Sequence, residues 1–215
     1  MKRFLAIILT LSIALSISMS VFAEGKATVT SGKILRLPEI TSNAPINIPV
    51  GDAEYIEDSN GKLIKISDLM HFSNQQEADN YLAQLSKQLS KTVQYNPQIS
   101  TATRSTHGDA LVASKGVSTG TIELRVAYST SGDSNTGTIT QANAYTTFTG
   151  FTLGFDWKEE VCYADITSSG KDIYAMASGE LEYYFLIDGL IQLGRKAVSL
   201  AVSYTHLTLP TKLEV

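Results

Sequence analysis

The chain has 215 residues with 17 basic and 21 acidic side chains, a formal net charge of −4, three histidines and a single cysteine. An acidic chain offers no extended basic surface to phosphate groups, so we expect no nucleic-acid partner. One cysteine also excludes an internal disulfide, so the fold must depend on its packed core.

Residues 1–23 have the pattern of a secretory signal peptide. The basic residues Lys2 and Arg3 precede an almost wholly apolar or hydroxylated run over residues 4–21, and Ala23 stands where signal peptidase reads a small side chain. The alternative is an uncleaved anchor, because the run approaches the roughly 20 residues that span a bilayer. An acidic residue follows at once and no basic cluster stops transfer. We therefore expect cleavage after Ala23, a secreted or cell-surface location, and no stable membrane span after cleavage.

Residues 24–94 are expected to form an extended leader, a hairpin and a helix. Three prolines, Pro38, Pro45 and Pro49, occur among Ser, Thr and Asn in residues 24–50, with only short apolar pairs between them. Such a composition is typical of extended backbone without regular pairing.

The hairpin is predicted at Asn60–Gly61, which lies between the alternating segments 54–57 and 62–66. The same turn has some features of a calcium loop. However, an EF-hand loop needs a bidentate Glu six residues after its glycine, whereas the nearest acidic residue, Asp68, stands seven after Gly61. We therefore predict an ordinary turn and no metal ligands.

A single amphipathic helix is predicted at about residues 74–91. Ser73 and Gln76 have capping-box spacing at its start. Apolar residues then recur at helical spacing, at Ala78, Tyr81, Leu82, Leu85 and Leu89. The stripe is narrow, so we expect it to dock on a neighbouring sheet.

Residues 95–120 are rich in Ser, Thr and Gly, and they are expected to form a linker with one possible strand at Ala110–Ala113. The pattern then changes to a period of two. Candidate strands follow at 121–128, 136–148, 151–157, 161–166, 172–187 and 190–200. Their spacing predicts a mainly β fold, an antiparallel Ig-like β-sandwich over residues 121–200. Gly179, midway along the longest strand, indicates a bulge or bend.

The segment Val202–Thr211 resembles one reading frame of a transposase-based sequencing adapter. The adapter DNA translates to these residues without a mismatch, and its flanking bases fit Ala201 and Lys212. The resemblance implies that residues 201–215 are an adapter-derived tail and that the natural sequence is last seen at Leu200.

Two constellations have the residue types of a hydrolase. His107 and Asp109 place an imidazole near a carboxylate among many serines, but no G-x-S-x-G elbow accompanies them. Glycoside hydrolysis needs two carboxyl groups facing each other across a sugar, which Glu159 with Glu160, or Glu180 with Glu182, could supply. Both pairs fall at expected turn or solvent-face positions, where acidic residues are ordinary. We therefore assign no catalytic residue and no cofactor, and no Gly-rich phosphate loop is present.

Aromatic side chains could stack on sugars. Trp157 shares its strand face with apolar residues and is expected in the core, whereas Tyr174 and Tyr184 are expected on the opposite, exposed face. Cys162 lies between Val161 and Tyr163 and is expected to be a buried small hydrophobe, with a reactive or intermolecular thiol as the alternative.

The segments Thr149–Trp157 and Ala177–Tyr184, with the helical segment Phe72–Leu85, resemble secreted β-rich proteins of unknown function from Gram-positive anaerobic bacteria. This resemblance implies a fold and no activity. We therefore expect a secreted, non-enzymatic binding module whose partner is an unknown extracellular protein or glycan. The alternatives are a secreted hydrolase acting on polysaccharide or peptidoglycan, and a self-assembling surface structural protein.

Overall fold

The fold is that of a computed structural model, which describes residues 28–30, 33–40, 44–58, 61–95, 106–118, 120–132, 137–150 and 154–206. The expected signal peptide with its cleavage site at Ala23 lies outside the described residues, as do residues 207–215.

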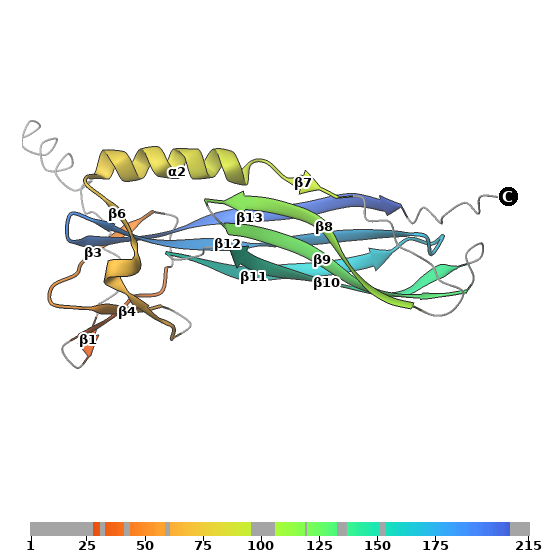
Figure 1. Ribbon diagram of the computed structural model, residues 1–215, viewed down its shortest axis with the longest axis horizontal. Coiled ribbons are helices and arrows are strands. Elements are labelled where there is room, and N and C mark those ends of the chain that lie inside the picture. Colours follow the sequence, from red (N-terminus) through yellow and green to blue (C-terminus); the bar gives the residue numbers. More distant parts are fainter. Residues whose placement is uncertain are drawn as a thin grey trace, which may run out of the picture.

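The elements follow one another in chain order (Figure 1). Before the long strands come β1 (Thr28–Thr30), β2 (Ile34–Arg36), β3 (Ile46–Pro49), β4 (Tyr55–Glu57), β5 (Leu63–Lys65), a 3-10 turn (Ile66–Asp68), β6 (Met70–Phe72), α2 (Gln75–Leu89) and β7 (Val93–Gln94). The long strands are β8 (Thr106–Val117), β9 (Gly120–Ser131), β10 (Thr138–Gly150), β11 (Phe155–Ile166), β12 (Asp172–Ile187) and β13 (Leu190–His206).

The long strands form two antiparallel sheets that face each other. One sheet has the order β10-β9-β8-β7, and the other has the order β11-β12-β13-β3. The predicted mainly β, antiparallel class with one helix is confirmed. The Ig-like arrangement is not confirmed, because consecutive long strands are neighbours in both sheets, whereas an immunoglobulin sandwich has Greek-key connections.

Alternating burial explains why these segments are strands. Along β9, Ile122, Leu124 and Val126 are buried, while Glu123 and Arg125 between them are partly exposed. Successive side chains of a strand point to opposite faces, so one face of β9 enters the space between the sheets and the other meets solvent. The main core fills this space and includes Val112, Ile122, Leu124, Phe155, Leu181, Phe185 and Leu200.

The expected linker at residues 95–120 contains a longer strand than the sequence indicated. β8 spans Thr106–Val117 and pairs along its length with β9. Its core-facing residues include the small Ala110 and Ala113 and the charged Lys115, which is buried. Small and charged residues on the buried face do not produce an alternation of large apolar and polar side chains. The composition of this segment therefore indicated a linker.

Helix α2 covers one open side of the sandwich, along β8 and the second sheet (Figure 1). Its N-cap is Asn74, one residue later than the predicted Ser73. The Asn74 side chain accepts a 3.0 Å hydrogen bond from the Glu77 amide, and Glu77 Oε2 accepts a 2.9 Å bond from the Ser73 amide. The stripe docks as predicted, with Ala78, Leu85 and Leu89 buried in the main core.

The N-terminal lobe is a small sheet of the order β1-β2-β4-β5. The predicted hairpin is confirmed, since β4 and β5 pair antiparallel with Tyr55 opposite Lys65. The expected leader is more regular than predicted, because β1 and β2 pair with each other and β3 joins the second sheet.

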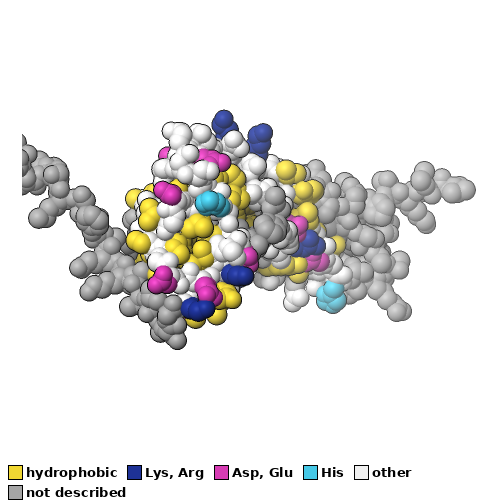
Figure 2. Space-filling model, turned by 60° about the vertical axis from the view of Figure 1, so that its left-hand side comes forward, with side chains coloured by type: hydrophobic (Ala, Val, Ile, Leu, Met, Phe, Trp, Pro, Cys, Tyr) yellow, Lys and Arg dark blue, Asp and Glu magenta, His cyan; other side chains and the backbone are white. Residues whose placement is uncertain are grey.

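A second core joins this lobe to the outer face of β12 and β13. Its buried residues are Leu35, Ile40, Ile48, Ala53, Ile56, Ile64, Ile66, Leu69, Tyr184, Ile191 and Leu193. As a result, β12 is buried on both faces between Leu181 and Phe185, where its alternating pattern becomes continuous. Figure 2 turns this end of the molecule forward and shows hydrophobic side chains among charged groups on its surface.

β13 continues past Leu200, the last residue before the expected adapter-derived tail. Ala201 lies opposite Met176 in β12, and Val202, which lies opposite Ala175, is buried in the main core. Backbone pairing requires no particular side chain, so the β12–β13 ladder accommodates residues of the natural protein and residues encoded by an adapter equally well.

Candidate binding cleft

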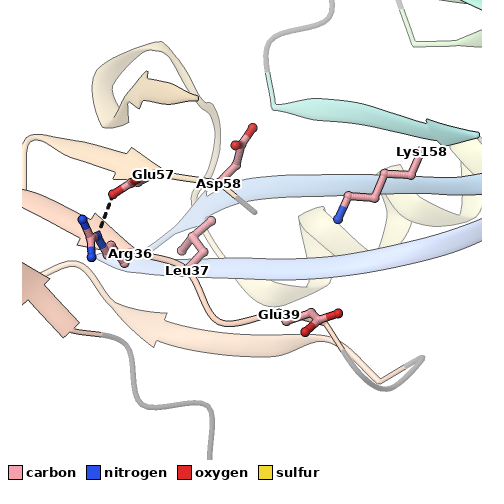
Figure 3. A pocket seen from close by; sticks show the side chains of 6 residues that line it. All are labelled: Arg36, Leu37, Glu39, Glu57, Asp58 and Lys158. Atoms are coloured by element: carbon pink, nitrogen blue, oxygen red, sulfur yellow. Dashed lines mark hydrogen bonds and ion pairs between the residues drawn. The ribbon is translucent and has the colours of Figure 1, made fainter. Parts of the chain in front are cut away.

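A cleft of about 620 Å³ lies where the N-terminal lobe meets the second sheet (Figure 3). Its lining comes from three separate parts of the chain: the end of β2 and the residues after it, the end of β4, and β11. The lining residues are Arg36, Leu37, Glu39, Glu57, Asp58 and Lys158. A volume of this size falls in the range of ligand-binding pockets.

The pairing of β2 with β4 positions an ion pair between Arg36 and Glu57 on one side of the cleft. β2 and β4 pair in parallel with Arg36 opposite Glu57. Arg36 Nε donates a 2.8 Å hydrogen bond to Glu57 Oε2, which Figure 3 shows as a dashed line. Glu39 lies on the segment after β2 and is exposed.

Asp58 is only 5% exposed, although it immediately precedes the hairpin turn. Its Oδ1 accepts a 2.8 Å hydrogen bond from the Lys62 amide, and the Gly61 amide donates to the Asp58 carbonyl at 3.0 Å. Gly61 has a φ of +77°, which a side chain would disfavour. The carboxylate thus closes the turn, in agreement with the predicted turn chemistry.

A buried group of polar side chains lies behind the cleft. Lys158 Nζ is 2.6 Å from Glu182 Oε1, and the Tyr184 hydroxyl donates a 2.8 Å hydrogen bond to Glu182 Oε2. Glu182 is only 4% exposed. Burial, together with the neighbouring Glu182 charge, raises the pKa of Tyr184 far above its usual range.

The expectation of surface positions for Glu182 and Tyr184 was therefore wrong. Both side chains point away from the main core, as their parity predicted, but the N-terminal lobe covers the outer face of β12 at this point.

Asp156 lies opposite Glu182 across the β11–β12 ladder. The pKa of Asp156 is raised, mainly by burial and further by the nearby charges of Asp58 and Glu182, while Lys62 and Lys158 act to lower it. The acidic groups around the cleft therefore act on one another electrostatically.

The acidic pairs are not arranged as facing catalytic carboxyls. Glu180 and Glu182 are two residues apart on one strand, so both point from the same face of β12. Glu180 pairs with Arg195 at 2.7 Å, and Glu182 pairs with Lys158. The Glu159 carboxylate accepts a 3.1 Å hydrogen bond from the Thr146 amide.

His107 and Asp109 are not joined in a triad. His107 Nδ1 is 2.8 Å from the Ser129 hydroxyl. Asp109 instead accepts a 2.8 Å hydrogen bond from Arg125 Nε and another from the Tyr145 hydroxyl. The carboxylate that would orient the imidazole is therefore engaged elsewhere on the same sheet face.

Trp157, Tyr174 and Cys162 are all partly buried, so Trp157 and Cys162 are less buried, and Tyr174 less exposed, than expected. Trp157 packs against the main core, and its Nε1 donates a 2.8 Å hydrogen bond to the Thr146 hydroxyl. Tyr174 is half-buried, with its ring centroid 6.0 Å from that of Tyr163. Cys162 is half-buried against the main core, and burial together with Glu159 raises the pKa of its thiol to about 11. A thiol with so high a pKa is a poor nucleophile near neutrality.

Sequence reasoning missed the cleft residues Arg36, Glu39 and Lys158. Lys158 precedes Glu159 in a strand with ordinary surface charges, and nothing in its neighbourhood marks it as part of a site. Arg36 follows the short apolar pair Ile34–Leu35 in the expected leader, and its partner cannot be identified without the parallel pairing of β2 with β4.

Comparisons with protein-family models, curated proteins and solved structures find no match for the chain. Among the described residues, no helix is long and apolar enough to cross a membrane. The same residues contain no group of three or more His, Cys, Asp or Glu side chains placed to hold a metal ion.

Proposed function

We propose that this chain is a secreted or cell-surface binding module without catalytic activity, and that its ligand occupies the cleft beside Lys158. The observation that carries the proposal is the cleft itself, to which both the N-terminal lobe and the sandwich contribute charged side chains. Ligand sites occur preferentially at such junctions.

The charges around the cleft favour a ligand with a cationic group. The carboxylates in and behind it are Glu39, Glu57, Asp58, Asp156 and Glu182, and the cations are Arg36, Lys62 and Lys158. Carboxylates exceed cations in this set, and Glu39 is the most accessible of those lining the cleft. An amine or guanidinium would therefore gain more than an anion on entering it.

Two features weigh against the alternatives. The ion pairs of Glu180 and Glu182 occupy the carboxylates that a secreted hydrolase would need, which supports a non-catalytic role. Self-assembly through strand pairing would need an accessible sheet edge. At the edge of β10, the Thr146 amide is engaged by Glu159, and charge at a sheet edge opposes strand addition.

The test is an NMR titration of the full chain with spermidine and with short peptides containing lysine or arginine. We expect Glu39→Lys to weaken binding by about tenfold or more, because it places a like charge against the ligand. Glu160→Lys, an exposed acidic residue on β11, is the matched control and should leave binding unchanged.

Equal binding to both variants would place the ligand elsewhere and refute the role of the cleft. Release of sugars from polysaccharide or peptidoglycan that disappears in Glu180→Gln or Glu182→Gln would refute the non-catalytic assignment.

A further inference from the structure

A second hollow, of about 470 Å³, lies on the solvent-facing side of the other sheet, over β8, β9 and β10. Its lining contains no Asp, Glu, Lys or Arg. The side chains that matter for its chemistry are His107, Ala127, Ser129, Gln141 and Asn143. It is therefore a different site from the charged cleft, on a different sheet and with different chemistry.

Ala127 forms the floor of the hollow. In the strand register it lies between Asp109 of β8 and Asn143 of β10. Along β9 its neighbours on the same face are Arg125 and Ser129, two residues away on either side. A single methyl group thus stands where the surrounding positions carry larger polar side chains, and this difference in size makes the depression.

One side of the floor is a row of three polar groups. His107 and Gln141 lie on either side of Ser129 in the register. The His107 imidazole is 2.8 Å from the Ser129 hydroxyl, which donates a 3.4 Å hydrogen bond to Gln141 Oε1. These contacts restrict the side-chain rotamers before any ligand arrives, which lowers the entropic cost of binding.

The other side is an ion pair with a phenol. Arg125 and Tyr145 both bond to Asp109, and these bonds lower the pKa of Asp109 despite the opposing effect of its burial. The charges of Arg125 and Asp109 compensate each other beside the hollow. Glu123, which also contacts Arg125, lies one row farther from Ala127.

We propose that this hollow binds a neutral saccharide. The lining carries no formal charge, so a charged ligand would find no ion-pair partner among the lining residues. Its imidazole, hydroxyl and two carboxamides supply both donors and acceptors, the combination that sugar hydroxyls require. The Ala127 methyl offers a small apolar floor to the C–H groups of a sugar ring, and the volume is sufficient for a small ligand.

The same groups fit catalysis less well. The Ser129 hydroxyl donates to Gln141, and the nearby carboxylate, Asp109, is engaged by Arg125 and Tyr145 instead of His107. A serine nucleophile needs a base that is itself oriented by a third group.

The experiment is a titration of the isotope-labelled full chain with short neutral oligosaccharides of glucose, xylose, mannose and N-acetylglucosamine, and with a sialylated oligosaccharide. We expect a neutral oligosaccharide to shift the backbone signals of β8, β9 and β10 around Ala127. Ala127→Phe, which fills the hollow, and Asn143→Ala, which removes an exposed carboxamide, should each weaken binding by about tenfold.

Ser199→Phe is the matched control, because it adds the same ring at an exposed position of the other sheet. Asn143→Ala also keeps the test decisive if Ala127→Phe fails to fold. The Glu39→Lys variant of the cleft should retain saccharide binding, so failure at one site is distinguishable from failure at the other. The proposal is refuted if no neutral sugar binds, if only the sialylated sugar binds, or if binding survives both hollow variants.

Discussion

At the scale of single residues, Lys158 connects the cleft to the buried polar group behind it. Its ammonium lines the cleft and pairs at 2.6 Å with Glu182, whose other oxygen receives the Tyr184 hydroxyl. Glu182 is almost fully buried, and these two partners replace the hydrogen bonds that water would otherwise make to its carboxylate. A buried ion pair contributes little when complete, but loss of one partner leaves an uncompensated charge.

Replacement of Lys158 by Met should therefore lower the free energy of unfolding by about 2 kcal/mol, less than for a fully buried pair because Lys158 is partly exposed. Urea denaturation at neutral pH measures the change. Lys33→Met breaks the pair with Glu54, in which both side chains are exposed, and should change stability little. Similar effects in the two variants would show that burial of Glu182 does not govern the pair.

At the scale of elements, the bulge in β11 depends on Gly179 of β12. The register shifts between Glu159 and Val161, and Gly179 lies opposite Glu159. A Cβ on Gly179 would stand 2.1 Å from the Lys158 carbonyl oxygen and 2.9 Å from the Trp157 ring. The glycine had indicated a bulge or bend in its own strand, whereas the extra residue lies opposite it, in β11.

We expect Gly179→Ala to destabilise the fold by about 2–3 kcal/mol, since backbone cannot yield as a flexible side chain does. Gly116→Ala in β8 is the control, because an added Cβ there meets no atom within 4 Å. The midpoints of thermal unfolding for the two variants provide the comparison. Equal midpoints would show that β11 can shift away from the added methyl.

Elements differ in how far their sequences predicted them. β9 and α2 bury large residues at strict spacing, so pattern alone located them. β8 has small and charged residues on its inner face, and Lys115 is buried because its ammonium donates to the Leu89 carbonyl at the end of α2. Burial of this lysine depends on a helix 26 residues earlier in the chain, which no local pattern contains.

At the scale of the whole molecule, the cleft exists because the N-terminal lobe packs on the second sheet. Strand parity correctly placed Tyr184 and Glu182 on the outer face of β12, but only the packing of Ile56 and Ile64 on that face buries it. The sequence therefore predicted the mainly β, antiparallel class and the direction of these two side chains, whereas the cleft required knowledge of which surfaces meet.

The packing of the two parts also gives stability a dependence on pH through Asp156, whose pKa is raised by burial and by the charges of Asp58 and Glu182. The folded protein binds this proton more tightly than the unfolded chain does. The stabilisation is therefore complete below the ordinary pKa of 3.8 and is lost as the pH rises through the folded value. Asp156→Asn should raise the free energy of unfolding at neutral pH, and the gain should vanish below pH 3.8.

Asp109→Asn provides the opposite case, because the pKa of Asp109 is lowered by its bonds to Tyr145 and Arg125, although burial opposes the shift. Its carboxylate stabilises the fold above the ordinary pKa, and that contribution is lost as the pH falls through the folded value. This variant should be less stable than the wild type at neutral pH.

Urea unfolding of the Asp156→Asn and Asp109→Asn variants across acidic and neutral pH measures how the free energy of unfolding of each depends on pH. If Asp156→Asn loses stability equally at every pH, then Asp156 acts through hydrogen bonding, and charge repulsion does not limit how closely the N-terminal lobe packs on the sandwich.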